Sequence, residues 1–242
     1  MIRRVPLGLS NKHIHLSQED LDYLFGEGYE LTPVKMLRQP GQFASQEKVT
    51  IVGPKGKLEN IRILGPVRKE TQLEVNIADG FTLGIRQVPI RNSGHLDGTP
   101  GFIIEGPDGK RLIKDKGMIV AERHIHLSAE EGERYKISDK DTVSVRLKGP
   151  RGLVFNNVIC RVGDGNLSEM HIDVEEGNAA GARNNQLACI IDPLTFTKDD
   201  MLIHDEGEPT IMVGDLPEME VEAADGTGDY ASEVELESES AL

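Results

Sequence analysis

His13-Ile14-His15-Leu16-Ser17 recurs as His124-Ile125-His126-Leu127-Ser128, and this repeated stretch determines how the chain is organised. In an extended strand, residues i and i+2 project from the same face, so both imidazoles of one copy can reach a single metal ion. On a helix the same spacing would turn the two side chains roughly 200° apart. Each copy therefore predicts a strand that carries two metal ligands.

The sequence that follows each copy is repeated as well. Strand-forming runs flank a Gly-Pro-basic-Gly turn at Gly53-Pro54-Lys55-Gly56 in the first half and at Gly149-Pro150-Arg151-Gly152 in the second. Gly106-Pro107-Asp108-Gly109 is a third turn of this kind. We expect the last glycine of each turn to supply a positive φ, while proline fixes the corner before it. Many short strands separated by turns favour a barrel or a sandwich.

A third metal ligand is predicted in each half by the register of the repeat. Asn60 matches Asn157 at an offset of 97 residues, and the same offset places Glu74 on His171. Three protein ligands with an open fourth position are typical of catalytic zinc, whereas a structural zinc ion is held by four. The two predicted ligand sets are His13, His15 and Glu74, and His124, His126 and His171.

Short helices are expected after each histidine pair. Ser17 fits an N-cap, with Asp20 three residues later and Gly26 ending the run, and Ser128 with Glu131 repeats the capping pattern. The predicted fold class is mainly β: two tandem, packed small β-barrels, each capped by a short α-helix, with a disordered acidic C-terminal tail. The duplicated ligand sets would most simply meet at the junction between the two barrels.

Charge and composition restrict the function. The net charge of −14 belongs to the tail, because fifteen acidic residues and no Lys or Arg lie from Asp199 onward; this low-complexity composition predicts disorder. We expect no membrane span and no signal peptide. Cys160 and Cys189 are expected to be reduced thiols of a cytoplasmic protein. The absence of tryptophan argues against a stacking surface for single-stranded nucleic acid.

Arg68 is the candidate for binding an anionic substrate. It lies six residues before Glu74, and an even spacing in a regular strand would direct both side chains to the metal-binding face. A surface salt bridge at the start of the strand is the alternative. Arg91 is a weaker candidate, and His95 and His204 are expected to be structural. The sequence contains no nucleophile elbow, P-loop or dinucleotide-binding fingerprint.

Several stretches, in unbroken order over about residues 5–192, resemble one family: the phosphate acyltransferases (phosphotransacylases) of the propanediol-utilisation type. These stretches are Leu9–Ser17, Tyr29–Pro33, Gln39–Ala44, Arg68–Glu74, Val88–Gly94, Arg123–Ser128 and Met170–Asp173.

The resemblance implies reversible transfer of a short acyl group, acetyl or propanoyl, between coenzyme A and phosphate. It implies direct attack by phosphate at a site with two metal ions, usually zinc, held by the two ligand sets above. Arg68 would bind the phosphate. The residues that would contact coenzyme A are Leu9, Ser10, Asn11, Lys55, Arg62 and Asn178.

The resemblance also implies a domain arrangement, in which residues 1–11 join 122–195 in one barrel, 12–121 form the other, and 196–242 are the tail. A homodimer is expected, with acyl-CoA and phosphate as small-molecule partners and neither nucleic acid nor membrane. Members packaged in microcompartments generally carry an N-terminal amphipathic extension. Only seven residues precede Gly8 here, which favours a free cytoplasmic enzyme over an encapsulated one, although the acidic tail leaves that question open.

Two other classes of function stay open at this point. A two-metal hydrolase of thioesters or phosphoesters would need no added phosphate and would release free acid. A zinc-stabilised binding module would close each metal site with a fourth protein ligand.

Overall fold

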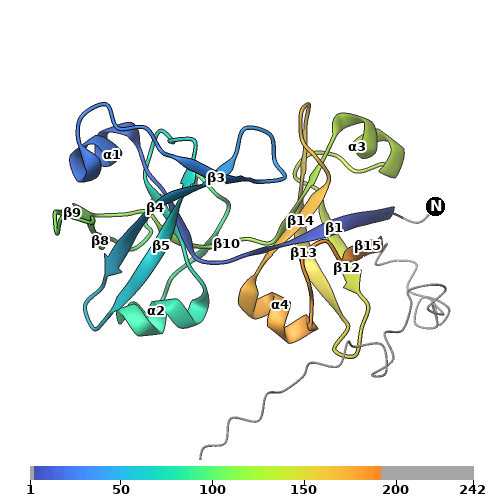
Figure 1. Ribbon diagram of the computed structural model, residues 1–242. Coiled ribbons are helices and arrows are strands. Elements are labelled where there is room, and N and C mark those ends of the chain that lie inside the picture. The colour runs from blue at the N-terminus through green and yellow to red at the C-terminus, as the bar shows by residue number, and fades with distance from the viewer. Residues whose placement is uncertain (1–2, 192–242) are drawn as a thin grey trace, which may run out of the picture. The chain divides into compact units, whose positions relative to one another are not determined.

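A computed structural model describes residues 3–191 of the chain, and this part is mainly β, as predicted (Figure 1). The predicted disordered tail and His204 lie outside the described residues. The first half contains β1 (Arg3–Ser10), β2 (His13–His15), α1 (Gln18–Phe25), β3 (Pro33–Met36), β4 (Phe43–Val52), β5 (Lys57–Gly65), β6 (Gln72–Glu74), α2 (Ile77–Leu83), β7 (Ile90–Arg91), β8 (Phe102–Glu105), β9 (Arg111–Lys114) and β10 (Met118–Ala121). The second half contains β11 (His124–Leu127), α3 (Ala129–Tyr135), β12 (Thr142–Leu147), β13 (Leu153–Val162), β14 (Glu169–Asp173), α4 (Val174–Ala180) and β15 (Leu187–Ile191).

The strands form two sheets. One is a closed barrel in the order β1-β14-β11-β13-β12-β15, and the other is a nine-stranded sheet in the order β7-β10-β6-β2-β5-β4-β8-β9, with β3 paired to β4. Strand β1 is parallel to β14 and antiparallel to β15. Figure 1 shows this blue strand among the yellow and orange strands of the second half. The first strand of the chain therefore completes a barrel that the second half builds.

Each sheet encloses its own hydrophobic core. In the closed barrel, Val5 and Leu7 of β1 are fully buried, because alternate residues of a strand face the same side. Burying one such side chain contributes about 1.5–3 kcal/mol, which explains why β1 is retained in this barrel. Ile14 of β2 and Ile61 and Ile63 of β5 are buried in the core of the other sheet.

The two halves repeat the same local topology around the histidine pairs. Strand β2 is parallel to β5 and antiparallel to β6, and β11 is parallel to β13 and antiparallel to β14. Helices α1 and α3 follow β2 and β11 as predicted. Ser17 accepts a hydrogen bond from the Asp20 amide, and Ser128 accepts one from the Glu131 amide. Gly26 ends α1 as predicted.

Two further helices, α2 and α4, were not predicted from the sequence. They follow the strands that carry Glu74 and His171, and their N-caps are Asn76 and Asp173. Both have a capping box, closed by Asp79 in α2 and by Glu176 in α4. The two N-caps are separated by the same 97 residues as Glu74 and His171, so the duplication extends to these helices.

The three Gly-Pro turns form hairpins as predicted, but the expected positive φ at the last glycine occurs only in one of them. Gly109 has φ 76°, whereas Gly56 and Gly152 are not in this region. A Cβ on Gly56 would lie 2.5 Å from the Thr82 oxygen, and one on Gly152 would lie 2.7 Å from the Leu147 oxygen. Close approach of the backbone, rather than backbone conformation, therefore requires glycine at these two positions.

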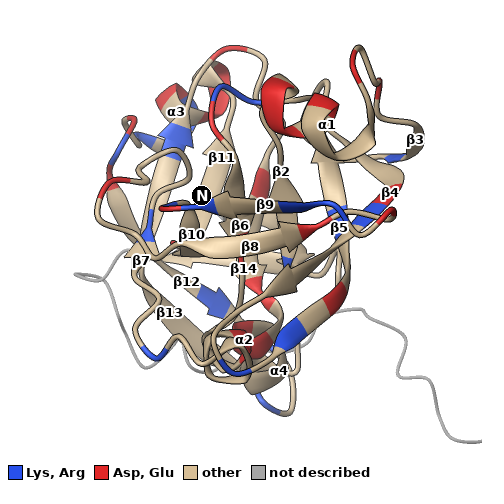
Figure 2. Cartoon of the chain, turned by 90° about the vertical axis from the view of Figure 1, so that its left-hand side faces the viewer, with Lys and Arg blue, Asp and Glu red and all other residues tan. Residues whose placement is uncertain are grey.

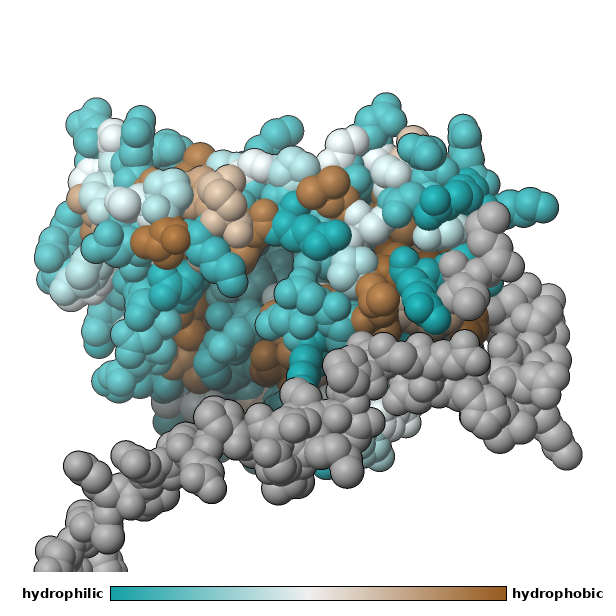
Figure 3. Space-filling model, turned by 45° about the vertical axis from the view of Figure 1, so that its right-hand side comes forward, coloured by the Kyte–Doolittle hydropathy of each residue, from teal (hydrophilic) through white to brown (hydrophobic). Residues whose placement is uncertain are grey.

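Basic and acidic residues are interspersed along the described part of the chain in Figure 2, which agrees with the nearly neutral sequence before the tail. The face shown in Figure 3 is mainly hydrophilic, with hydrophobic residues scattered between polar ones. Within residues 3–191, no helix has the length and apolar character needed to cross a bilayer.

Candidate metal centre

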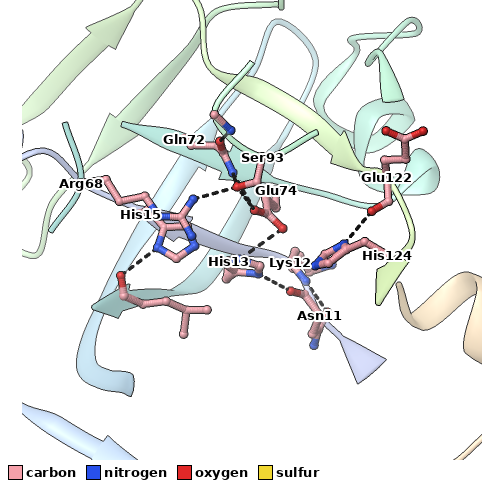
Figure 4. Close-up of polar contacts among 12 residues, drawn as sticks. Asn11, Lys12, His13, His15, Arg68, Gln72, Glu74, Ser93, Glu122 and His124 are labelled. Atoms are coloured by element: carbon pink, nitrogen blue, oxygen red, sulfur yellow. Dashed lines mark hydrogen bonds and ion pairs between the residues drawn. The ribbon is translucent and has the colours of Figure 1, made fainter. Parts of the chain in front are cut away.

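The first predicted ligand set comes together at one point of the nine-stranded sheet. His13 and His15 on β2 and Glu74 on β6 place their ligand atoms within 4.8 Å of one another. His13 and Glu74 are direct partners in the antiparallel pair, and the His13 Nε2 atom lies 3.4 Å from Glu74 Oε2. His13 Nδ1 donates to the Asn11 backbone oxygen at 2.8 Å (Figure 4). This bond fixes the tautomer and leaves Nε2 free for a cation.

The ring of His15 is also oriented by a hydrogen bond to a backbone oxygen, which belongs to β5. Its Nδ1 atom donates to the Leu64 backbone oxygen on β5 at 3.1 Å, and its ring stands edge-on to that of His13 at 5.1 Å. Burial, followed by the nearby charges of His13 and Arg68, lowers the pKa of His15 well below its usual value. The imidazole is therefore neutral at pH 7, which is the form that binds a metal ion.

The second set has the same construction in the closed barrel. His124 and His126 on β11 and His171 on β14 place their ligand atoms within 4.8 Å of one another, and His124 faces His171 across the antiparallel pair. His124 Nδ1 donates to the Glu122 backbone oxygen at 2.8 Å, as His13 does to Asn11. His171 Nε2 lies 2.8 Å from the Glu169 carboxylate. These bonds match the outer-shell partners that orient metal-binding histidines.

His126 provides a test of whether a metal fits. Its Nδ1 atom is buried and has no hydrogen-bond partner, an arrangement that costs free energy unless something else uses the nitrogen. Burial, followed by the charges of His171 and Arg161, lowers the pKa of His126 to about 4. Nitrogen and carboxylate donors in sets of three suit Zn²⁺ with an open position. Both groups of side chains therefore fit a catalytic divalent metal. Within residues 3–191, each group contains three residues.

Arg68 lies beside the first group, although the reason given from the sequence is wrong. It precedes β6 and is outside that strand, so the even spacing to Glu74 does not determine its direction. Instead, its Nη1 atom donates to the Ser93 hydroxyl at 2.8 Å, and that hydroxyl lies 3.3 Å from Glu74 Oε1. Gln72 Nε2 also donates to Glu74 Oε1, at 2.6 Å (Figure 4). Arg68 and His15 line a cavity of about 250 Å³.

The model of the phosphate propanoyltransferase family matches residues 6–183. The chain belongs to this family. The match includes both groups of metal-competent side chains and Arg68, so the resemblance suggested by the sequence is confirmed.

Three curated phosphate propanoyltransferases illustrate the similarity. The Thermotoga maritima protein is 53% identical over 79% of this chain and 92% of its own length. The Rhodobacter capsulatus protein is 51% identical over 77% of this chain and 86% of its own. The Salmonella typhimurium protein is 49% identical over 75% of this chain and 86% of its own. This phosphate propanoyltransferase family member is therefore a phosphate acyltransferase.

The residues predicted to contact coenzyme A are distributed over both sheets. Leu9 at the end of β1 packs against Gly177 of α4, next to the exposed Asn178. Lys55 packs against Gly84 at the end of α2. Figure 1 shows α2 and α4 side by side, and the Ala78 amide donates to Glu175 between them. The residues Leu9, Ser10, Asn11, Lys55 and Asn178 are together called the α2–α4 edge below.

Arg62 is the exception among these residues. It pairs with His13 in the register of β2 and β5, and its guanidinium donates to the Ser45 backbone oxygen on β4. The contacts that hold Arg62 therefore lie beside the metal-competent group rather than on the α2–α4 edge.

Other candidates from the sequence lie apart from the two groups. The exposed Arg91 donates to the neighbouring Ile90 oxygen, and His95 is in an exposed loop. Cys160 is buried, and burial raises the pKa of its thiol to about 12, which disfavours the thiolate form that attacks as a nucleophile. Two residues near the groups were missed: Ser93 and Arg161. An arginine inside the apolar run of β13 was the available signal for Arg161.

Proposed function

We propose that this phosphate acyltransferase transfers a short acyl group, acetyl or propanoyl, reversibly between coenzyme A and phosphate at two zinc ions. The observation that carries the proposal is the pair of three-ligand groups, with Arg68 beside one of them. Propanoyl is favoured because it appears in the name of the family and of the relatives.

The two ligand sets would each hold one ion. His13, His15 and Glu74 would bind the first, and the second would be bound by His124, His126 and His171. When bound, such ions supply Lewis acidity toward a thioester carbonyl and charge stabilisation of a departing thiolate. The carbonyl contacts at Nδ1 of His13 and His124 support this assignment, since each directs the other ring nitrogen toward its group.

Arg68 would bind and orient the phosphate. Arg68 is partly buried, and burial lowers the pKa of its guanidinium while the Glu74 carboxylate raises it. A guanidinium in such a place forms strong bidentate hydrogen bonds with phosphate oxygens. Holding the phosphate beside the thioester would favour direct attack, which yields acyl phosphate and coenzyme A without an acyl-enzyme.

Coenzyme A would lie along the α2–α4 edge and reach the metal-binding groups near Arg62. The Lys55 ammonium and the Asn11 and Asn178 amides on this exposed edge suit a ligand that carries phosphates. Leu9 and Ser10 lie at the end of β1, directly before the His13 strand, so they connect this edge to the first ligand set.

The test is an assay of purified enzyme with propanoyl-CoA, with and without inorganic phosphate, in which free thiol and acyl phosphate are both measured. Thiol release that depends on phosphate and matches acyl phosphate formation supports the proposal. Thiol release without phosphate, accompanied by free propanoate, would instead identify a thioester hydrolase. Elemental analysis of the active enzyme should give two zinc ions per chain, and acetyl-CoA in parallel defines the acyl preference.

A further inference from the structure

A second arginine lies between the two metal-competent groups. Arg161 is on β13, where it pairs with His126 in the parallel register with β11. Its positive charge helps to lower the pKa values of His124 and His126 in one group. The Glu74 carboxylate of the other group raises the pKa of Arg161. One guanidinium thus lies close to both ligand sets.

Arg161 and Arg68 are held by two consecutive residues. Arg161 Nη2 donates to Asn92 Oδ1 at 2.9 Å, and Arg68 Nη1 donates to Ser93 Oγ at 2.8 Å. Asn92 and Ser93 directly follow β7 in the first half of the chain, whereas Arg161 belongs to the closed barrel. The segment Asn92-Ser93 therefore contacts one arginine from each half of the chain.

No carboxylate forms an ion pair with either arginine in residues 3–191. Glu74 acts on both guanidinium groups from a longer distance, and Glu122 and Asp139 act on Arg161 in the same way. The charge of Arg68 lowers the pKa of Arg161, so the two guanidinium groups repel each other, and both residues are partly buried. Burying like charges is costly unless an anion compensates them. Each guanidinium has five donors and uses one of them here, so the remaining donors are available to an anion.

We propose that Arg161 is a second anion-binding residue of the acyl-transfer site, which together with Arg68 holds the phosphate or the phosphoryl end of an acyl phosphate. Asn92 is a positioning residue, because it acts through Arg161. This inference rests on the proposed function for the identity of the anion. The competing role for Arg161 is structural, as one end of a hydrogen bond that joins the two sheets.

An Asn92→Asp variant separates these two roles, because it keeps the shape of the side chain and adds a negative charge beside Arg161. A structural tether would be preserved or strengthened by the new ion pair, and phosphate kinetics would not change. An anion-binding arginine would be neutralised, so the KM for phosphate should rise roughly ten-fold or more. The KM for propanoyl-CoA should stay within about two-fold, since it reports a different ligand.

Arg161→Ala and Arg161→Lys should be measured beside Asn92→Asp, with Arg111→Ala on the exposed strand β9 as the control for loss of one positive charge. The second readout is the rise in Tm that inorganic phosphate causes in the zinc-loaded protein, which requires binding but no turnover. We expect this rise to be lost in Arg161→Ala and reduced in Arg161→Lys and Asn92→Asp. Arg111→Ala should behave as wild type, and all variants should retain two zinc ions per chain.

A phosphate KM and a phosphate-induced Tm rise equal to wild type in Asn92→Asp and in the folded Arg161 variants would overturn the inference. If Arg161→Ala does not fold, Arg161→Lys and Asn92→Asp decide the question by the same two readouts. Failure of the proposed function is distinct, because it would remove phosphate-dependent turnover from the wild type. Loss of the phosphate-induced Tm rise in the Arg161 variants would still support an anion site in that case.

Discussion

Asn60 and Asn157 share a left-handed backbone conformation, with φ values of 59° and 56°, at matching positions of the two halves. Each lies in a β-bulge: the register shifts between β4 and β5 beside Asn60, and between β12 and β13 beside Asn157. A bulge increases the local twist of a hairpin and changes the direction of the strand that follows. In both halves that strand runs parallel to the one that carries the histidine pair. The bulges therefore help to align the ligand-bearing strands.

Replacing Asn157 by Val should destabilise the protein by about 1–2 kcal/mol, because a β-branched residue is strained at positive φ. Asn157→Gly should be close to neutral, since glycine adopts this conformation without strain. Asn157 is exposed, so a loss of packing does not confuse the comparison. Chemical denaturation of both variants gives the two free energies of unfolding. Equal free energies of unfolding for Asn157→Val and Asn157→Gly would show that the left-handed conformation does not affect stability. Asn60 allows the same comparison in the first half of the chain.

His171→Ala should remove one of two zinc ions per chain and reduce turnover below about one-thousandth of wild type. The reason is that two histidines on one strand cannot by themselves complete a stable site with three protein ligands. Elemental analysis and the propanoyl-CoA assay measure the two quantities. His95→Ala is the matched control, because His95 is an exposed loop histidine outside both groups. Retention of both ions in His171→Ala would remove His171 from the ligand set.

The grouping of the metal-competent side chains in two sets of three could be predicted because it depends on short-range geometry and on a duplication. Two side chains on the same face of a strand define the His-x-His pairs, and the 97-residue offset correctly aligned Glu74 with His171. That offset also aligns the capping boxes of α2 and α4, which begin at Asn76 and Asp173. These helices are seven residues long, too short for hydrophobic periodicity to be recognised, so their caps were the usable signal.

The anion-binding side could not be derived in the same way. Arg68 was selected on the assumption of a regular strand, but the chain before Gln72 is irregular and hydrogen bonding to Ser93 directs the side chain instead. Arg161 lies far along the chain from its neighbours. Its position depends on the pairing of β11 with β13 and on Asn92 from the other sheet, and local spacing predicts neither contact. That coenzyme A contacts the α2–α4 edge, and that the enzyme is a cytoplasmic dimer, stay predictions.

Arg68→Ala should raise the KM for phosphate at least about ten-fold and lower kcat, because a charge-assisted pair of hydrogen bonds to phosphate is lost. Zinc content should not change, since Arg68 is not a ligand. Steady-state kinetics with phosphate as the varied substrate provides the measurement. The phosphate KM of Arg68→Lys should lie between those of the wild type and Arg68→Ala, because lysine keeps the charge but lacks the planar guanidinium. An unchanged phosphate KM in Arg68→Ala would exclude the assigned role.

The metal-free protein should lose stability as the pH falls from about 6.5 toward 4. An exposed histidine of the unfolded chain has a pKa near 6.5. In the folded protein, burial, followed by the charges of His171 and Arg161, lowers the pKa of His126 to about 4. Burial also lowers the pKa values of His15 and His124 well below the usual value. Between pH 6.5 and 4 the unfolded chain therefore binds more protons than the folded protein. The stability that comes from keeping these histidines neutral is fully present above pH 6.5 and is lost as the pH falls toward 4.

Thermal unfolding of chelator-treated protein between pH 8 and 4 tests this expectation. His126→Asn should reduce the slope of Tm against pH in the range 6.5–4, because it removes one of the titrating groups. The carboxylate of Glu169 also has a lowered pKa: burial raises it, but the hydrogen bonds from His171 and Gln39 outweigh that effect. The stability that Glu169 contributes is lost only below about pH 4.5, so Glu169 cannot account for a Tm that begins to fall at pH 6.5. A Tm that stays constant from pH 7 to 5 in the metal-free protein would contradict the assignment of neutral histidines, and with it the view that these imidazoles are uncharged when they bind a metal.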